Sequence, residues 1–100
     1  MGSSDLKFDA LALEGLLRKK GDYAHVSVRS RAGHLHVEVE EAEGVRSAVA
    51  RATPIGRSQY GLSFRTHAGK WEPMPVSGSL QEITEGLVEL LGPYLDRPKL

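Results

Sequence analysis

Two histidines and a glutamate alternate along one short stretch of the chain. Because successive side chains in an extended strand point to opposite faces, His34, His36 and Glu38 share one face, with His25 near them on the preceding strand. Imidazole and carboxylate groups are ligands that Zn²⁺ and Ni²⁺ accept. The predicted pairing, however, sets Arg29 opposite His36, and a guanidinium group repels a metal cation. We therefore expect no metal and no cofactor, with His34 and His36 as the candidate ligands if a metal does bind.

The basic residues between positions 44 and 71 suggest a second chemistry. This stretch lacks acidic residues and contains Arg46, Arg51, Arg57, Arg65 and Lys70, together with the aromatic residues Tyr60, Phe64 and Trp71. A basic sheet with aromatic side chains is typical of proteins that bind single-stranded nucleic acid. Tyr60 and Phe64 share a strand face of the kind that forms a core, however, and the net charge is zero. We therefore keep this function as the alternative, with these basic residues: Arg29, Arg31, Arg57, Arg65 and Lys70.

Two segments that start 36 residues apart have nearly the same sequence. Residues 27–35 read SVRSRAGHL and residues 63–71 read SFRTHAGKW. Each segment alternates around an Ala-Gly pair, which predicts two β-hairpins with equivalent turns and basic tips. If the exposed face of the sheet binds a partner, we expect the two tips to bind it, through Arg29, Arg31, His34, Arg65, His67 and Lys70.

The elements that must position these residues begin with a helix near the N-terminus. Asp9 is a candidate N-cap, and Phe8 before it is placed to pack one turn further along. Three basic residues followed by Gly21 are typical of a helix C-terminus that closes on a left-handed glycine. The first helix is therefore predicted over residues 10–20.

The next two strands are predicted to form a hairpin. From Tyr23 the apolar residues recur at every second position, and they do so again from His34 onward. A turn at Ala32-Gly33 pairs Val28 with Val37, so that the apolar faces of both strands coincide. Ala24 is predicted to point to the same apolar face, and His25 to the polar one.

Residues 45–53 fit the spacing of a helix as well as that of a strand. We favour a strand, because the stretch is short and a loop at 55–57 leads directly into the next strand at 59–66. A turn at Ala68-Gly69 would then oppose Arg65 to Glu72. The fifth strand is predicted to be short and at an edge, because it contains two prolines, which lack the N–H needed for pairing.

The second helix has a capping box at its start. Ser79 stands three residues before Glu82, directly ahead of a periodic apolar stretch. Gly92-Pro93 is predicted to end the helix, after which Tyr94 and Leu95 fold back onto the core.

These elements predict an α+β fold in a single domain, residues 1–100, with residues 1–7 and 96–100 loosely ordered. The architecture is a two-layer sandwich in which an antiparallel sheet of four to five strands, containing two hairpins, carries the N-terminal and the C-terminal helix on one face. The element order is α-β-β-β-β-(β)-α. The apolar and charged fractions, 40% and 26%, are those of a folded domain.

The sequence contains no pattern that indicates catalysis, such as a nucleophile beside a base or a phosphate-binding glycine loop. It also has no cysteine, which fits a cytoplasmic protein, and no apolar run long enough for a membrane span. We therefore predict a small non-enzymatic binding or accessory module. Its expected partner is another protein or a second copy of the chain, because small domains commonly bury an exposed edge or face in symmetric dimers.

Overall fold

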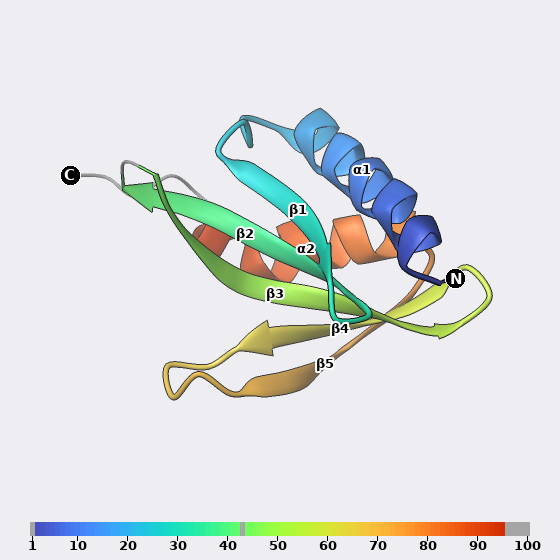
Figure 1. Cartoon of the computed structure of the whole chain (residues 1–100). Helices are drawn as coiled ribbons and strands as arrows, with labels where there is room; N and C mark the ends of the chain where they lie inside the picture. The colour runs from blue at the N-terminus through green and yellow to red at the C-terminus, as the bar shows by residue number, and fades with distance from the viewer. Residues whose placement is uncertain (1, 43, 96–100) are drawn as a thin grey trace.

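The computed structural model describes residues 2–42 and 44–95. Seven elements follow one another along the chain: α1 (Gly2–Lys20), β1 (Val26–Arg31), β2 (His34–Ala42), β3 (Val45–Gly56), β4 (Gln59–Arg65), β5 (Trp71–Gly78) and α2 (Leu80–Leu95). The strands form one antiparallel sheet in the order β1-β2-β3-β4-β5, and both helices lie on the same side of it (Figure 1). The predicted two-layer α+β architecture is confirmed.

The core lies between the helices and the inward face of the sheet. Its helical part comes from apolar residues at helical spacing, and its sheet part from alternate strand positions. The residues that are completely buried include Leu13, Leu17, Leu35, Val37, Leu62, Ile83, Leu87 and Leu95. The opposite face of the sheet has no helix over it among the described residues (Figure 1).

The ambiguous stretch at residues 45–53 is a strand, as favoured from the sequence. β3 runs on to Gly56, and its turn to β4 lies at Arg57-Ser58 rather than at 55–57. An irregularity in the pairing between Pro54 and Gly56 accommodates the extra length, since an additional residue is left unpaired there.

The first predicted hairpin has the predicted register, with Val28 opposite Val37 and Arg29 opposite His36. Ala32 and Gly33 both have positive φ, +51° and +81°, which is the backbone of a two-residue type I′ turn. The strand itself begins at Val26, later than predicted. Residues 23–25 form a turn instead, with the result that Ala24 is exposed and His25 is buried.

The second predicted hairpin is shifted by one residue from the predicted register. Arg65 lies opposite Trp71, and Glu72 lies opposite Phe64. The backbone amide of Thr66 donates to the carbonyl of Lys70 (2.8 Å), which closes a three-residue loop in which only Gly69 has a positive φ. The two similar sequences therefore form different turns, because the second Ala-Gly pair is preceded by one more loop residue.

α1 begins at Gly2, well before the predicted start. The apolar side of this helix that faces the core includes Leu6, which precedes Ala10 and packs against the core. The helical spacing of apolar residues therefore continues N-terminal to the predicted cap. Asp9 is therefore inside the helix, where its carboxylate accepts a hydrogen bond from the Tyr60 hydroxyl, and Phe8 is exposed. Burial and this bond to Asp9 raise the pKa of Tyr60 to about 12. The helix ends at Lys20 as predicted, but Gly21 does not adopt a left-handed conformation.

The capping box of α2 is confirmed by both of its hydrogen bonds. The Glu82 amide donates to Ser79 Oγ (3.3 Å), and the Ser79 amide donates to Glu82 Oε1 (2.9 Å). The regular helix is interrupted at Leu91, where φ is −118°, directly before the predicted end at Gly92-Pro93. A further helical segment then continues to Leu95, which was not predicted. Proline is tolerated there because it lies in the first turn after the kink, where its missing N–H needs no partner.

A hydrogen bond and a buried side chain hold the last turn of α2 against the core. His25 Nε2 is hydrogen-bonded to the carbonyl of Leu95, and the Leu95 side chain is buried as predicted. Tyr94, in contrast, is 62% exposed, so the prediction that it folds back onto the core is wrong. The predicted loose ordering of residues 96–100 lies outside the described residues.

Two side chains of α1 cover the free edge of β1. Val28 donates its backbone N–H to Glu14 Oε1 (2.8 Å), and the Val26 carbonyl accepts from Arg18 Nη2 (3.2 Å). Glu14 and Arg18 also pair with each other at 3.3 Å. The unpaired backbone groups of an edge strand can pair with another chain, and these hydrogen bonds satisfy two of those groups on β1. At the other edge, β5 carries Pro73 and Pro75, in agreement with its predicted edge position, although it is eight residues long rather than short.

Candidate functional site

The face of the sheet opposite the helices, here called the open face, carries mainly polar and basic side chains. Strand alternation places them there, because their neighbours in sequence point into the core. The open face contains Arg29 and Arg31 from β1, His34, His36 and Glu38 from β2, Arg51 from β3, Arg65 from β4 and Trp71 from β5. Five neighbouring strands therefore contribute to one surface.

The centre of the open face is an arginine–tryptophan cluster made of His36, Arg51, Arg65 and Trp71. The guanidinium carbon of Arg51 lies 4.6 Å from the centre of the indole ring, and that of Arg65 lies 5.6 Å from it. The His36 ring meets the indole edge to face at 5.5 Å. A cation over an indole face is an attractive contact, so the cluster holds two positive charges without a carboxylate.

The pairing of the strands explains how Trp71 reaches β2 and β3 from the edge of the sheet. Trp71 pairs with Arg65 on β4, while Ser63 on the same strand lies opposite Arg51 of β3. Arg51 in turn lies opposite His36 of β2. Ser63 lies opposite Pro73 and diagonally across from Trp71, and because serine is small the indole can extend over β4 toward Arg51.

Arg51 has a polar atom without a partner. Its Nε is buried, and within the described part of the chain it makes no hydrogen bond. A buried N–H that lacks an acceptor costs free energy, on the order of 1–3 kcal/mol. Arg51 is therefore a cation whose neighbours, Trp71 and His36, supply an aromatic surface but no anion.

Beside the cluster is a hollow of about 410 Å³ lined mainly by charged residues. Three arginines, Arg31, Arg46 and Arg65, contribute to its wall, together with Glu38, Ser47 and Ala48. Glu38 is the one carboxylate of this lining, and its Oε1 lies 4.0 Å from Arg29 Nε. The hollow therefore has an excess of positive charge and suits an anionic group.

The two histidines of β2 lie in this basic surrounding. His34 Nδ1 is hydrogen-bonded to Thr53 Oγ1 (2.8 Å), and the His34 and His36 rings are 6.0 Å apart. Burial lowers the pKa of both imidazoles, and the charge of Arg51 lowers it further; His36 is also affected by His34 and Arg31, while Glu38 acts in the opposite direction. Both imidazole rings therefore accept a proton less readily than a free histidine side chain.

We predict that acid weakens the fold through these two histidines. Their pKa is lower in the folded chain than the ordinary value of about 6.5, so the unfolded chain binds more protons as the pH falls below about 7. The free energy of unfolding should therefore decrease between pH 7.5 and 5.5, as measured by urea denaturation. His36→Asn should flatten this dependence, and His67→Asn should leave it unchanged. A midpoint that stays constant or rises on acidification in the wild-type chain would contradict the prediction.

Within the described residues, no three histidine, cysteine, aspartate or glutamate side chains are grouped closely enough to hold a metal ion. The surroundings of His34 and His36 explain why this pair lacks further ligands. Arg31 and Arg29 lie opposite them on β1, and Arg51 lies opposite His36 on β3.

The structure places the six binding residues predicted from the sequence in two different regions. Arg29, Arg31, His34 and Arg65 lie on the open face, whereas His67 and Lys70 belong to the β4–β5 turn. Because successive turns of a meander alternate between the two ends of the sheet, the two basic tips lie at opposite ends (Figure 1). The strands that lead to the tips, rather than the tips themselves, bring these basic residues together.

Arg46, Arg51 and Trp71 were noted in the basic stretch of the sequence but were not included among the expected binding residues. The signal for Arg51 was present, because Ala50 and Ala52 on either side of it are small apolar residues that both point into the core. It was hidden by the helix-like spacing of residues 45–53. Arg57, a basic residue of the nucleic-acid alternative, lies exposed in the β3–β4 turn.

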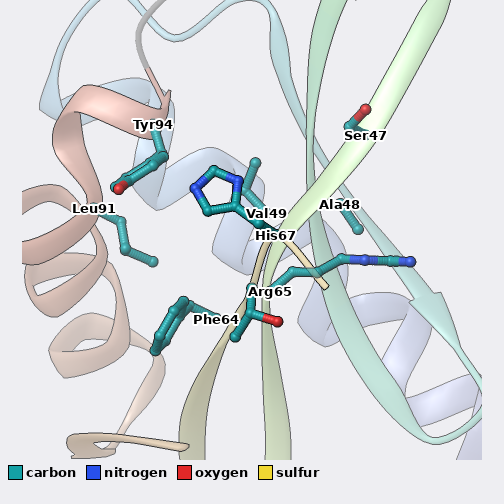
Figure 2. Close-up of a pocket in the computed structure, with 9 residues that line it drawn as sticks. Ser47, Ala48, Val49, Phe64, Arg65, His67, Leu91 and Tyr94 are labelled. Carbon is teal, nitrogen blue, oxygen red and sulfur yellow. The ribbon is translucent and has the colours of Figure 1, made fainter. Parts of the chain in front are cut away.

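A second hollow, of about 350 Å³, lies on the helix side of the sheet near the end of α2. Figure 2 shows Leu91 and Tyr94 of α2 facing Val49 and Phe64 across it, with His67 beside them. The lining is mostly apolar, and the kink at Leu91 together with the exposed Tyr94 forms its rim. This hollow differs in chemistry from the one on the open face.

Comparison with known proteins identifies no relative: no family model, curated protein or solved structure matches this chain. Neither described helix combines the length and the apolar character needed to cross a membrane.

Proposed function

We propose that this protein is a non-enzymatic binding module whose open face binds single-stranded nucleic acid. The observation that carries the proposal is the arginine–tryptophan cluster beside the hollow lined by Arg31, Arg46 and Arg65. Single strands are bound by grooves that combine positive charge along the backbone path with aromatic rings for the bases. Guanidinium groups also stack on bases, so Arg65 and Trp71 offer adjacent planar surfaces.

The distribution of charge over the molecule supports this proposal, although the net charge does not. The chain as a whole has a charge of zero, which by itself argues against a nucleic-acid partner. Three of its thirteen acidic residues, Glu82, Glu85 and Glu89, belong to α2, which lies on the opposite side of the sheet from the open face. A local basic field attracts a polyanion even when the total charge is balanced.

Trp71 makes the proposal easy to test, because it is the only tryptophan of the chain and lies within the proposed site. We expect a single-stranded oligonucleotide of about 12 nucleotides to change its fluorescence. The affinity should fall as the salt concentration rises. If the three arginines of the hollow each contact one phosphate, a plot of log K against log salt should have a slope of roughly −2.

Variants locate the binding surface. Arg65→Ala should weaken binding and make the slope less negative by about 0.7, the contribution of one phosphate contact in a single strand. Arg57→Ala is the matched control, because it removes an arginine from the β3–β4 turn, away from the cluster. Equal effects of the two substitutions would refute the open face as the site.

Competing polyanions distinguish the kind of partner. An absence of any fluorescence change at low salt would overturn the proposed function. Equal affinity for poly-glutamate and the oligonucleotide would instead indicate an acidic protein partner that is recognised by charge alone. A preference for a duplex over the single strand would exclude base stacking on this face, because paired bases are not free to stack on side chains.

A protein partner, most simply a second copy of the chain, is the second candidate function. The apolar hollow in Figure 2, with Tyr94 exposed at its rim, is the observation that favours it. Light scattering at micromolar concentration should then detect a dimer that Tyr94→Ser dissociates. A monomer at all concentrations would exclude self-association.

A cytoplasmic location is part of both proposals, because it fits a chain without cysteine.

A further inference from the structure

We infer that the open face takes up protons when it binds its anionic partner, so that His34 and His36 make binding tighter as the pH falls. This inference rests on the proposed function and concerns the regulation of the same site. It follows from the position of the two imidazoles, which lie among several arginine side chains and a single carboxylate, that of Glu38.

Every strand that packs around the two histidines contributes to their electrostatic surroundings. On β1, Arg29 lies opposite His36 and Arg31 lies opposite His34, and on β3 Arg51 lies opposite His36. The uncharged Trp71 of β5 contacts the His36 ring, and Arg65 of β4 lies over the same indole. The groups that face the pair are therefore Arg29, Arg31, Arg51 and Arg65 on the positive side and Glu38 on the negative side.

In the free protein this surrounding disfavours the protonated form of both imidazoles. Partial burial and the nearby guanidinium groups lower the pKa of both rings, and protonation of one opposes protonation of the other. The only opposing carboxylate among the facing groups is Glu38, which is also close to Arg29. Phosphates placed over this face would reverse the balance, since an anion favours the charged form of a neighbouring imidazole.

Each imidazole ring is placed so that, once protonated, it can interact with a bound anion. His34 Nδ1 is engaged with Thr53 Oγ1, so when Nδ1 donates to that hydroxyl, Nε2 is the nitrogen that gains the proton. His36 lies at the edge of the indole ring, within the proposed stacking surface. Two further positive charges would then join the arginines of the open face.

Linkage determines the direction and the upper limit of the effect. If binding raises the proton affinity of the histidines, protons must raise the affinity for the nucleic acid by the same factor. Two titrating groups limit the change to two protons, and log K cannot rise by more than two per pH unit on their account. We expect the affinity to be about tenfold higher at pH 5.5 than at pH 7.5, which is an ordinary coupling between two sites.

The test measures affinity and proton uptake separately. Fluorescence titrations of the full chain with a single-stranded oligonucleotide are made at pH 5.5, 6.5 and 7.5 at constant ionic strength. Calorimetric titrations near pH 6.5, in two buffers with different ionisation enthalpies, count the protons taken up by the wild-type protein. The second measurement needs no substitution, so it holds even if a histidine variant fails to fold.

The variants assign the effect to the cluster. His36→Asn and His34→Asn should each reduce the proton uptake and the pH dependence, while His67→Asn, in the β4–β5 turn, should leave both unchanged. Binding that is independent of pH, with no proton uptake, would overturn this inference and leave the proposed function standing. So would an equal loss of pH dependence in His67→Asn. An absence of binding at every pH would overturn the proposed function itself.

Discussion

Substitution of Gly86 by alanine is expected to lower the free energy of unfolding by about 1–3 kcal/mol, the range typical of overpacking. Gly86 is buried in α2 where the helix packs on β5. A Cβ atom there would lie 2.6 Å from Val76 Cγ1 and 3.1 Å from Cγ2, much closer than carbon atoms approach in proteins. Val76 is β-branched and has few alternative rotamers, so either the helix or the strand must move. Urea denaturation measures the loss.

Gly15→Ala is the matched control for this substitution. Gly15 is also inside a helix, but it is exposed, and a Cβ there meets nothing within 4 Å. Alanine should therefore stabilise the protein by about 0.5–1 kcal/mol through helix propensity alone. The opposite signs at the two glycines separate packing from propensity. Val76→Ala should relieve part of the cost in the Gly86→Ala background; purely additive effects would show that the clash is not the cause.

Removal of the Glu14 carboxylate is expected to destabilise the fold by about 1–3 kcal/mol and to promote association through β1, because a buried partner loses a hydrogen bond to a charged group. In Glu14→Ala, the Val28 N–H loses its acceptor, and Arg18, which donates to the Val26 carbonyl, loses its ion pair. An uncovered strand edge can pair with a second chain. Urea denaturation and light scattering measure the two consequences.

Glu85→Ala provides the comparison for this variant. Glu85 also belongs to a helix and lies near a basic residue, Lys20, but the two charged atoms are 4.0 Å apart and the Glu85 side chain is 55% exposed. Exposed pairs of this kind contribute little, so we expect a change within about 0.5 kcal/mol. Glu14→Gln, which keeps an acceptor oxygen, should recover part of the stability. Equal losses in Glu14→Ala and Glu85→Ala would show that the contact with the edge strand is unimportant.

The repeated Ser-Arg-Ala-Gly segments show how far local sequence predicts a hairpin. Both form one, because alternation and a glycine at the turn are local properties. The turn type and register differ, however. Ala32-Gly33 forms a two-residue turn, whereas the turn before Lys70 contains three residues and shifts Arg65 from Glu72 to Trp71. That one-residue shift places the indole beside a guanidinium group and thereby builds the centre of the candidate site.

The ends of the helices also show which features local sequence predicts and which depend on distant contacts. The capping box of Ser79 and Glu82 was predictable, because its hydrogen bonds join residues three positions apart. Asp9 has the chemistry of a cap too, but its carboxylate binds Tyr60, a residue 51 positions away. The helix is interrupted at Leu91, next to the expected end at Gly92-Pro93, but the chain resumes a helical path to Leu95, which is buried and contacts His25. Distant contacts outweigh local preference in both cases.

The element types, the one-sided core and the antiparallel pairing were therefore predictable from the amino-acid sequence, because they depend on periodicity and on neighbours along the chain. The position at which the basic and aromatic side chains of the candidate site meet depends instead on how the strands pair. The meander separates the two basic tips to opposite ends and brings Arg31, Arg51 and Arg65 from three different strands onto one face. Side chains that lie side by side across a sheet are far apart in sequence, and the register that aligns them depends on turns and irregularities of a single residue.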